Sequence, residues 1–199
     1  MDRRSLFGKS IFEFGGLVKR AFEEKRREEA DLAGLPPKLF RPPGALAEKD
    51  FLDQCTRCND CIEACPHGVV YKHFESHSPD NLTPTLSPGV MPCRMCEDVP
   101  CAKACTTGAL VFPPDRKAMT IGKAEILIDT CLAWNGAECT VCLETCPETP
   151  KALVLDAENR MRVRESLCTG CGMCEQNCPR GSFAIRIVPL RKEPAAPKN

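Results

Sequence analysis

The sixteen cysteines of this chain constrain its fold more than any other feature, because they fall into four groups of four. The groups read CTRCNDCIEACP, CRMCEDVPCAKACT, CLAWNGAECTVCLETCP and CTGCGMCEQNCP, and no cysteine lies outside them. Only 6% of the 199 residues are aromatic, so the chain has little bulky material for a large apolar core. We therefore expect chemistry at the cysteines to organise the fold.

Two of the groups have the spacing of iron–sulfur ligands, because the first and fourth read C-x2-C-x2-C-x3-C-P. This spacing holds three thiolates in one tight loop around a [4Fe–4S] cluster, and in two-cluster ferredoxins the cysteine before Pro ligates the other cluster. Structural zinc sites instead take four cysteines from two separate C-x2–4-C pairs, so the spacing favours iron–sulfur over a structural zinc protein. The lack of a clear secretory signal disfavours a disulfide framework.

The other two groups depart from this spacing. The second widens one interval to x4 through EDVP and has Thr106 in place of Pro, changes that need only a larger loop and remove no ligand. The third places LAWNGAE between Cys131 and Cys139, so by spacing alone Cys131 is the least certain ligand, and we expect Trp134 to pack within this insertion. Since three complete groups leave four cysteines for a fourth cluster, we predict four [4Fe–4S] clusters. The predicted iron ligands are Cys55, Cys58, Cys61, Cys65, Cys93, Cys96, Cys101, Cys105, Cys131, Cys139, Cys142, Cys146, Cys168, Cys171, Cys174 and Cys178.

Short β-rich runs follow each cysteine group and predict a mixed fold. The runs are GVVYKHF, GALVF, KALVLD and SFAIRIV, and EILID and MRVRE add strands before the third and fourth groups. Each x3 interval before a final cysteine suits a single helical turn, ended by Pro in three cases. We predict an α+β fold of two bacterial-ferredoxin-like (βαββαβ) units in residues 51–190. Around it we predict an N-terminal amphipathic helix in 1–33, a candidate docking segment, then a Pro-rich linker in 34–50 and a disordered tail in 191–199.

Composition and motifs narrow the functions. Acidic and basic residues number 27 each, which gives no electrostatic argument for nucleic acid, and no apolar run is long enough for a transmembrane helix. No G-x-G-x-x-G or P-loop motif is present, so we expect an electron carrier rather than an enzyme with a substrate site. Arg3 and Arg4 faintly resemble a twin-arginine export signal, but charged residues interrupt the apolar stretch that should follow, and we expect a cytoplasmic protein. We interpret the three histidines as solvated loop residues: His67, His73 and His77.

Several segments resemble known polyferredoxins. The segment RPPGALAEKDFLDQCTRCNDCIEAC resembles the start of the first cluster motif in NapF-type ferredoxins. From PCRMCEDVPCAKAC through CLAWNGAECTVCLETCP to CTGCGMCEQNCP, the chain is similar to NapG and MauM proteins, in which the odd spacings of the second and third groups recur. The resemblance covers about residues 41–188. It implies four [4Fe–4S] clusters in a protein that moves electrons, with Cys131, Cys139, Cys142 and Cys146 serving together as one ligand set.

The pairing of the groups and the role of the protein each allow two interpretations. The strand runs around the third and fourth groups would complete one ferredoxin unit, leaving the first two groups as another. Related four-cluster subunits of molybdenum enzymes instead nest the second and third groups inside a unit made from the first and fourth, and by this analogy we lean to the nested arrangement. For function, we expect a relay of single electrons between a donor and a partner oxidoreductase, such as a molybdenum enzyme or a membrane quinone-linked complex. The alternative is an iron–sulfur assembly or maturation factor for a partner redox enzyme.

Overall fold

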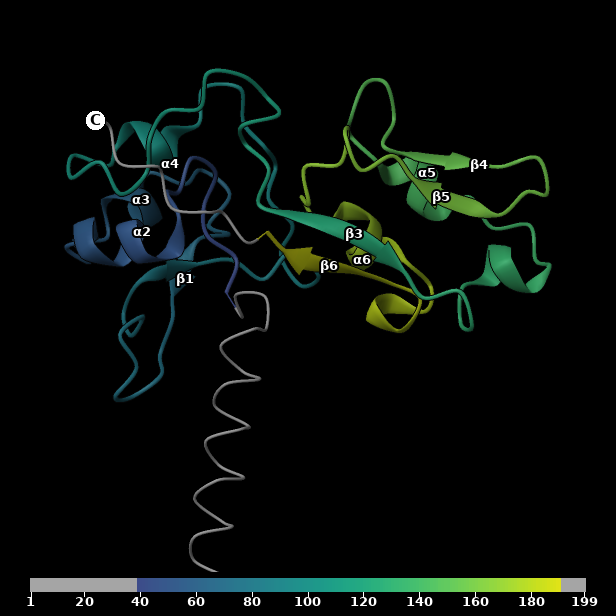
Figure 1. The fold of residues 1–199 in the computed structure, drawn as a ribbon, viewed down its shortest axis with the longest axis horizontal. Coiled ribbons are helices and arrows are strands. Elements are labelled where there is room, and N and C mark those ends of the chain that lie inside the picture. Colours follow the sequence, from purple (N-terminus) through teal and green to yellow (C-terminus); the bar gives the residue numbers. More distant parts are fainter. Residues whose placement is uncertain (1–38, 191–199) are drawn as a thin grey trace, which may run out of the picture. The chain divides into compact units, whose positions relative to one another are not determined.

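The computed structural model describes residues 39–190, so the predicted N-terminal helix and C-terminal tail lie outside the described residues. Within this range, residues 39–121 and 122–190 form two modules of small helices and short antiparallel strands (Figure 1). The first module contains α2 (Glu48–Gln54), α3 (Asp60–Glu63), β1 (Tyr71–Lys72), β2 (Pro84–Thr85) and α4 (Pro100–Lys103). The second contains β3 (Gly122–Ile126), η1 (Leu132–Asn135), α5 (Val141–Thr145), β4 (Leu153–Leu155), β5 (Met161–Val163), α6 (Met173–Asn177), η2 (Gly181–Phe183) and β6 (Ile185–Pro189). These elements confirm the predicted mixture of small helices and strands.

The second module has the element order of a ferredoxin unit, β3-α5-β4-β5-α6-β6, with the 3-10 helices η1 and η2 added. Strand β3 pairs antiparallel with β6, from Gly122 opposite Pro189 to Ile126 opposite Ile185, and β4 pairs with β5 as a hairpin. Burial alternates over the first residues of β6, as expected of a strand with one face against a helix. That helix is α6, which lies behind the β3–β6 ribbon in Figure 1.

The first module is less regular. The run GALVF, predicted as a strand, forms only a single bridge, between Leu110 and Ala45. The backbone on both sides of the bridge is nevertheless paired, because the Leu46 N–H donates to the Ala109 carbonyl at 3.1 Å and the adjoining residues 44 and 111 bond at 2.8 Å. The described part of the predicted Pro-rich linker therefore packs as an edge of this module.

The loop around Cys171 brings the two modules together. Gly172 has φ +95°, and a Cβ at this position would lie 2.2 Å from the carbonyl oxygen of Pro88 in the first module. This position requires glycine, because any side chain would collide with the backbone of the other module. The close approach allows the Cys93 N–H to donate to the Cys171 carbonyl at 2.9 Å.

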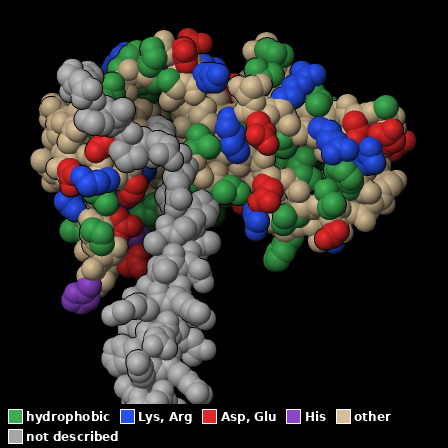
Figure 2. All heavy atoms as spheres, in the orientation of Figure 1, with side chains coloured by type: hydrophobic (Ala, Val, Ile, Leu, Met, Phe, Trp, Pro, Cys, Tyr) green, Lys and Arg blue, Asp and Glu red, His purple; other side chains and the backbone are tan. Residues whose placement is uncertain are grey.

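Cysteines make up much of the core. One buried cluster contains Phe51 and Met95 in the first module, and another contains Leu153 and Met161 in the second. Eight of the sixteen cysteines are buried among them. On the face shown in Figure 2, basic and acidic side chains are interspersed over the described surface. None of the helices in residues 39–190 is long and apolar enough to span a bilayer.

Candidate iron–sulfur centres

The sixteen thiols gather in four sets of four. Three sets line three separate small pockets, and in the remaining set Cys65, Cys96 and Cys101 lie close enough to Cys93 for their charges to affect its pKa. We name the sets in the order in which they adjoin one another. Site I is Cys55, Cys58, Cys61 and Cys105; site II is Cys65, Cys93, Cys96 and Cys101; site III is Cys146, Cys168, Cys171 and Cys174; site IV is Cys131, Cys139, Cys142 and Cys178.

Each site takes three cysteines from one sequence group and the fourth from another. Cys65 of the first group belongs to site II, and Cys105 of the second group belongs to site I. In the same way, Cys146 of the third group belongs to site III, and Cys178 of the fourth group belongs to site IV. The nested arrangement is therefore wrong, and so is the expectation that the third group forms one ligand set. The reason is local packing: α3 contacts α4 and α5 contacts α6, so each helical turn carries its final cysteine to the neighbouring loop.

Left-handed backbone shapes three of the four cysteine loops. In each of these loops, the second residue after the first cysteine and the second residue before the third cysteine have positive φ. The residues are Arg57 and Asn59 in the first group, Met95 and Val99 in the second, and Gly170 and Gly172 in the fourth. Turns of this kind point successive backbone N–H groups into a shared concavity, as at many iron–sulfur sites. This conformation costs each non-glycine residue roughly 1–3 kcal/mol, and strained residues of this kind cluster at functional sites.

The insertion in the third group holds Cys131 at site IV. Cys131 is the N-cap of η1, and its own N–H donates to the Leu127 carbonyl at 2.9 Å. The Asn135 side chain donates back to the Cys131 carbonyl at 2.8 Å, which closes the turn. The inserted residues are therefore an ordered turn, and Cys131 faces the same cavity as Cys139 and Cys142.

Trp134, the single tryptophan of the chain, fixes this turn to β5. Its indole N–H donates to the Met161 carbonyl at 2.9 Å. The guanidinium groups of Arg160 and Arg162 lie 4.9 and 4.4 Å from its ring centroid, within the range of cation–π attraction. Trp134 therefore packs, as predicted, but its contacts reach beyond the insertion to residues on and beside β5.

The sulfurs of each site are spaced too widely for one zinc ion. Among the residues that the structure describes, a single group of three His, Cys, Asp or Glu side chains has all its ligand atoms within 4.8 Å of one another, and that group contains no cysteine. Four sulfurs around a zinc ion, with Zn–S bonds of about 2.3 Å, would lie about 3.8 Å apart. The thiols of sites I to IV surround a wider space, which fits a multi-iron cluster held by four thiolates.

Burial differs among the sites and sets the proton affinity of their thiols. All four cysteines of site III are buried, whereas Cys58 of site I is exposed. Burial, reinforced by neighbouring thiolates, raises the pKa to about 12 in four thiols: Cys61, Cys93, Cys101 and Cys142. Such thiols are protonated at neutral pH, so loading these sites with metal would release protons.

Cys105 of site I differs from these thiols. Burial alone would raise its pKa, but hydrogen bonds lower it below the usual value. The Thr107 hydroxyl lies 3.5 Å from the sulfur, and the Leu110 N–H donates to the sulfur at 3.3 Å. Hydrogen bonds to ligand sulfurs are one of the factors that set cluster potentials. Thr107 was missed at the sequence level, because nothing in the spacing marks a residue two positions beyond a ligand.

Arg116 and Glu148 form a second contact between the modules. Glu148 is 7% exposed and accepts hydrogen bonds from Arg116 at 2.7 and 3.1 Å and from the Thr169 hydroxyl at 2.7 Å. Arg116 also donates to the Met95 carbonyl in the site II loop at 3.0 Å. Burial, neighbouring thiolates and the Glu148 charge raise the pKa of Cys171 to about 11. The pair thus ties the loops of sites II and III, a contact that sequence analysis missed because its residues lie 32 positions apart among many other charges.

Comparisons with known proteins also point to iron–sulfur proteins. Residues 161–183, which include four cysteines of sites III and IV, match the family described as 4Fe-4S binding domain. The chain is 39% identical over 165 residues to the methylamine utilization ferredoxin-type protein MauM of Paracoccus denitrificans, covering 76% of this chain and 72% of that relative. With MauM of Methylophilus methylotrophus the identity is 39% over 202 residues, or 94% and 87% of the two chains. With the ferredoxin-type protein NapG of Escherichia coli K12 it is 37% over 167 residues, or 76% and 71%.

These relatives share sequence with most of the chain and are ferredoxin-type proteins by name. The match to a 4Fe-4S binding domain covers the very segment that supplies ligands to both sites of the second module. The resemblance inferred from the cysteine spacings is therefore confirmed. This chain belongs to the MauM and NapG family of ferredoxin-type iron–sulfur proteins.

Proposed function

We propose that the chain holds four [4Fe–4S] clusters, one at each of sites I to IV, and relays single electrons between a donor and a partner oxidoreductase. The observation that carries this proposal is the gathering of all sixteen thiols into four crossed sets of four. When bound, each cluster would supply reversible one-electron chemistry. The residues of the chain hold the clusters by their thiols, limit their contact with water and fix the distances between them.

Contacts between neighbouring sites support a linear order, I-II-III-IV. Cys61 of site I and Cys101 of site II lie close enough for one thiol to affect the pKa of the other, as do Cys142 of site IV and Cys174 of site III. The two inner sites meet where the Cys93 N–H donates to the Cys171 carbonyl. Because each site adjoins the next, an electron arriving at one outer site can cross the whole protein in three short steps.

The burial of the thiols supports sites I and IV as the ends of this path. Site III is buried at all four cysteines, so it is screened from outside partners. Site I exposes Cys58, and three of the four cysteines of site IV are half-buried. A donor and an acceptor would therefore meet the protein at opposite ends of the series, with site III exchanging electrons only with its neighbours.

For the partners, we propose redox proteins such as a molybdenum enzyme or a membrane quinone-linked complex. We also propose a cytoplasmic location, because thiols of this number remain reduced and available to iron in that compartment. Cell fractionation followed by immunodetection of the full chain tests the location. Recovery with periplasmic marker proteins would contradict it.

Metal analysis tests the cluster content directly. Protein purified under anaerobic conditions should contain about 16 iron and about 16 acid-labile sulfide per chain, since each cluster contains four of each. Mössbauer spectroscopy should assign this iron to [4Fe–4S] clusters. Colourless protein rich in zinc, or iron near eight per chain, would contradict the proposal of four clusters.

An electron carrier acts on a partner enzyme that is already complete, whereas an assembly factor acts while the partner is being made, and this difference can be tested. Reduced chain, mixed in a stopped-flow instrument with a partner enzyme that is already complete, should be oxidised while the partner is reduced. If the partner becomes active only when the chain is present during its synthesis, the protein acts as a maturation factor instead.

A further inference from the structure

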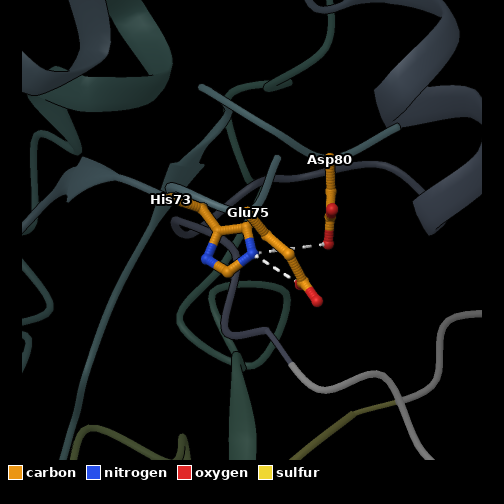
Figure 3. Close-up of side chains that lie close together, drawn as sticks. All are labelled: His73, Glu75 and Asp80. Atoms are coloured by element: carbon orange, nitrogen blue, oxygen red, sulfur yellow. Dashed lines mark hydrogen bonds and ion pairs between the residues drawn. The ribbon is translucent and has the colours of Figure 1, made fainter. Parts of the chain in front are cut away.

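Three side chains outside the iron–sulfur sites converge at the base of the loop between β1 and β2. Figure 3 shows the Nε2 atom of His73 facing the carboxylates of Glu75 and Asp80, at 3.2 and 3.9 Å. All three ligand atoms lie within 4.8 Å of one another, and no other trio of His, Cys, Asp or Glu in residues 39–190 meets this condition. We propose that these residues form a binding site for a divalent transition metal of the zinc class, separate from the clusters. His73 was expected to be a solvated loop residue, but it has two carboxylate neighbours instead.

The backbone of the loop brings the three groups together. His73 continues the β1–β2 ladder, because its N–H donates to the Thr83 carbonyl at 2.9 Å and its carbonyl accepts from the Leu82 N–H at 2.7 Å. Glu75 follows two residues later, and in extended backbone this spacing places two side chains on the same side. Asp80 arrives from the returning arm of the loop. The pairing of the two arms therefore fixes the donor groups before any ion binds.

Asp80 is held most firmly of the three. Its carboxylate accepts a hydrogen bond from the Ser78 hydroxyl, and its backbone carbonyl accepts one from the hydroxyl of Thr83. Thr83 is fully buried, and its hydroxyl is bonded in turn by the buried Arg41 guanidinium at 2.8 Å. Glu75 is the most exposed, at 56%, and can adjust its position by rotation of its side chain. With Asp80 already fixed, only the Glu75 side chain has to be ordered when an ion binds, so little conformational entropy is lost.

The donor set favours a borderline transition metal. Histidine nitrogen and Asp or Glu oxygen are both ligand types of zinc, and three protein ligands would leave the fourth tetrahedral position to water. Ligands at about 2.0–2.2 Å from such an ion lie roughly 3.4 Å apart, close to the 3.2 Å that separates His73 from Glu75 and slightly less than its distance to Asp80. Calcium and magnesium prefer oxygen ligands alone and in greater number. Zn²⁺ is therefore the probe of choice.

The position of the site gives the ion a structural role beside site I. Arg57, which stands between Cys55 and Cys58, donates to the carbonyls of Pro79 and Asn81 at 2.8 and 3.0 Å, on either side of Asp80. An ion that fixes Asp80 would thereby fix the loop that Arg57 grips. Arg57 directly precedes Cys58, the exposed cysteine of site I.

The test uses the complete chain with its iron–sulfur centres intact, equilibrated anaerobically with Zn²⁺ and freed of excess ion by gel filtration. We expect one zinc per chain, and X-ray absorption at the zinc edge should show nitrogen and oxygen ligands at about 2.0–2.2 Å. The variants His73→Gln and Asp80→Asn should each weaken zinc binding at least about tenfold, the loss that even an outer-shell partner can cause. Glu75→Gln, at the most exposed position, should weaken binding without affecting the fold. His77→Gln, on the same loop but outside the trio, is the matched control and should bind zinc as the unaltered chain does.

The alternative explanation of the same contacts is an ion pair between a protonated His73 and the two carboxylates, which needs no metal. This alternative predicts that neither the unaltered chain nor any variant retains zinc after gel filtration. Sulfur scattering near 2.3 Å would show that zinc had replaced iron at the cysteines, and it would also overturn the proposal. Equal zinc binding by Glu75→Gln and His73→Gln and by the unaltered chain would do the same. Because the readout is zinc itself, these outcomes do not depend on whether the protein transfers electrons.

Discussion

The hydroxyl of Thr107 is placed to tune the cluster at site I, because it lies 3.5 Å from the sulfur of Cys105. Replacing Thr107 by Val keeps the shape of the side chain and removes the hydrogen bond. Since a hydrogen bond contributes about 0.5–1.5 kcal/mol, we expect the potential of one cluster to fall by roughly 20–60 mV. Redox titration followed by EPR spectroscopy measures the shift. Thr106→Val, at the adjacent exposed position, should leave all potentials unchanged, and an equal shift in both variants would contradict this role.

Gly172 controls how closely the modules approach. Ala at this position would carry a Cβ 2.2 Å from the Pro88 carbonyl oxygen, at a backbone φ of +95°. We expect Gly172→Ala to lower the free energy of unfolding by about 2–4 kcal/mol, since backbone strain and overpacking add. Gly181→Ala is the control: Gly181 also has positive φ, but no atom lies within 4 Å of a Cβ built there, so only about 1 kcal/mol should be lost. Thermal denaturation of the two variants under anaerobic conditions gives the comparison, and equal losses would show that contact with Pro88 does not matter.

At the scale of elements, the helical turns decide which cysteines lie together at one site. Cys131 shares site IV with Cys178, whereas Cys146, from the same sequence group as Cys131, belongs to site III. The double variant Cys131→Ala/Cys178→Ala should therefore lose about four iron per chain, because both changes fall on one cluster. The double variant Cys131→Ala/Cys146→Ala should lose about eight. Iron and sulfide analysis distinguishes the two, and the reverse result would mean that each sequence group keeps its own cluster.

The sequence was enough to predict the cysteine loops and the helical turns, but not which cysteine groups share their ligands. The intervals of the first and fourth groups are enough to predict cysteine loops and helical turns, because C-x2-C-x2-C fits few other structures. Strands β4, β5 and β6 overlap the predicted runs KALVLD, MRVRE and SFAIRIV, but β3 at Gly122–Ile126 begins three residues before the predicted run EILID and shares only two residues with it. The partner of each final cysteine could not be read in this way, since it depends on which helical turns pack together. The contact of Arg116 with Glu148 depends likewise on how the folded modules meet.

At the scale of the whole molecule, the Arg116–Glu148 pair fixes one module against the other. Arg116→Gln would leave the buried Glu148 carboxylate with Thr169 as its remaining donor. Because Arg116 is itself 41% exposed, we expect a loss of about 1–3 kcal/mol rather than the full cost of breaking a buried pair, and a midpoint of thermal unfolding lower by roughly 2–10 °C. The uncompensated charge near Cys171 should also lower the potential of the cluster at site III.

Arg186→Gln is the matched control for this change. Arg186 pairs with Glu125 at 2.8 Å, but both side chains are about half exposed, so the loss should stay below about 1 kcal/mol. Melting curves and redox titrations of the two variants, run side by side, make the comparison. If Arg186→Gln is as damaging as Arg116→Gln, burial of the pair between the modules is not what gives it importance.

The exchange of final cysteines between neighbouring groups also sets the order in which a nascent chain can become complete. Once Cys105 has left the ribosome, all eight cysteines of sites I and II are present. Until the last sequence group has been made, site III has only Cys146 of its four cysteines, and site IV lacks Cys178. A chain halted between residues 147 and 167 would therefore carry a finished first module and four cysteines that cannot complete either remaining set. The order of the cysteines along the chain therefore allows the four ligand sets to be completed in two stages, sites I and II before sites III and IV.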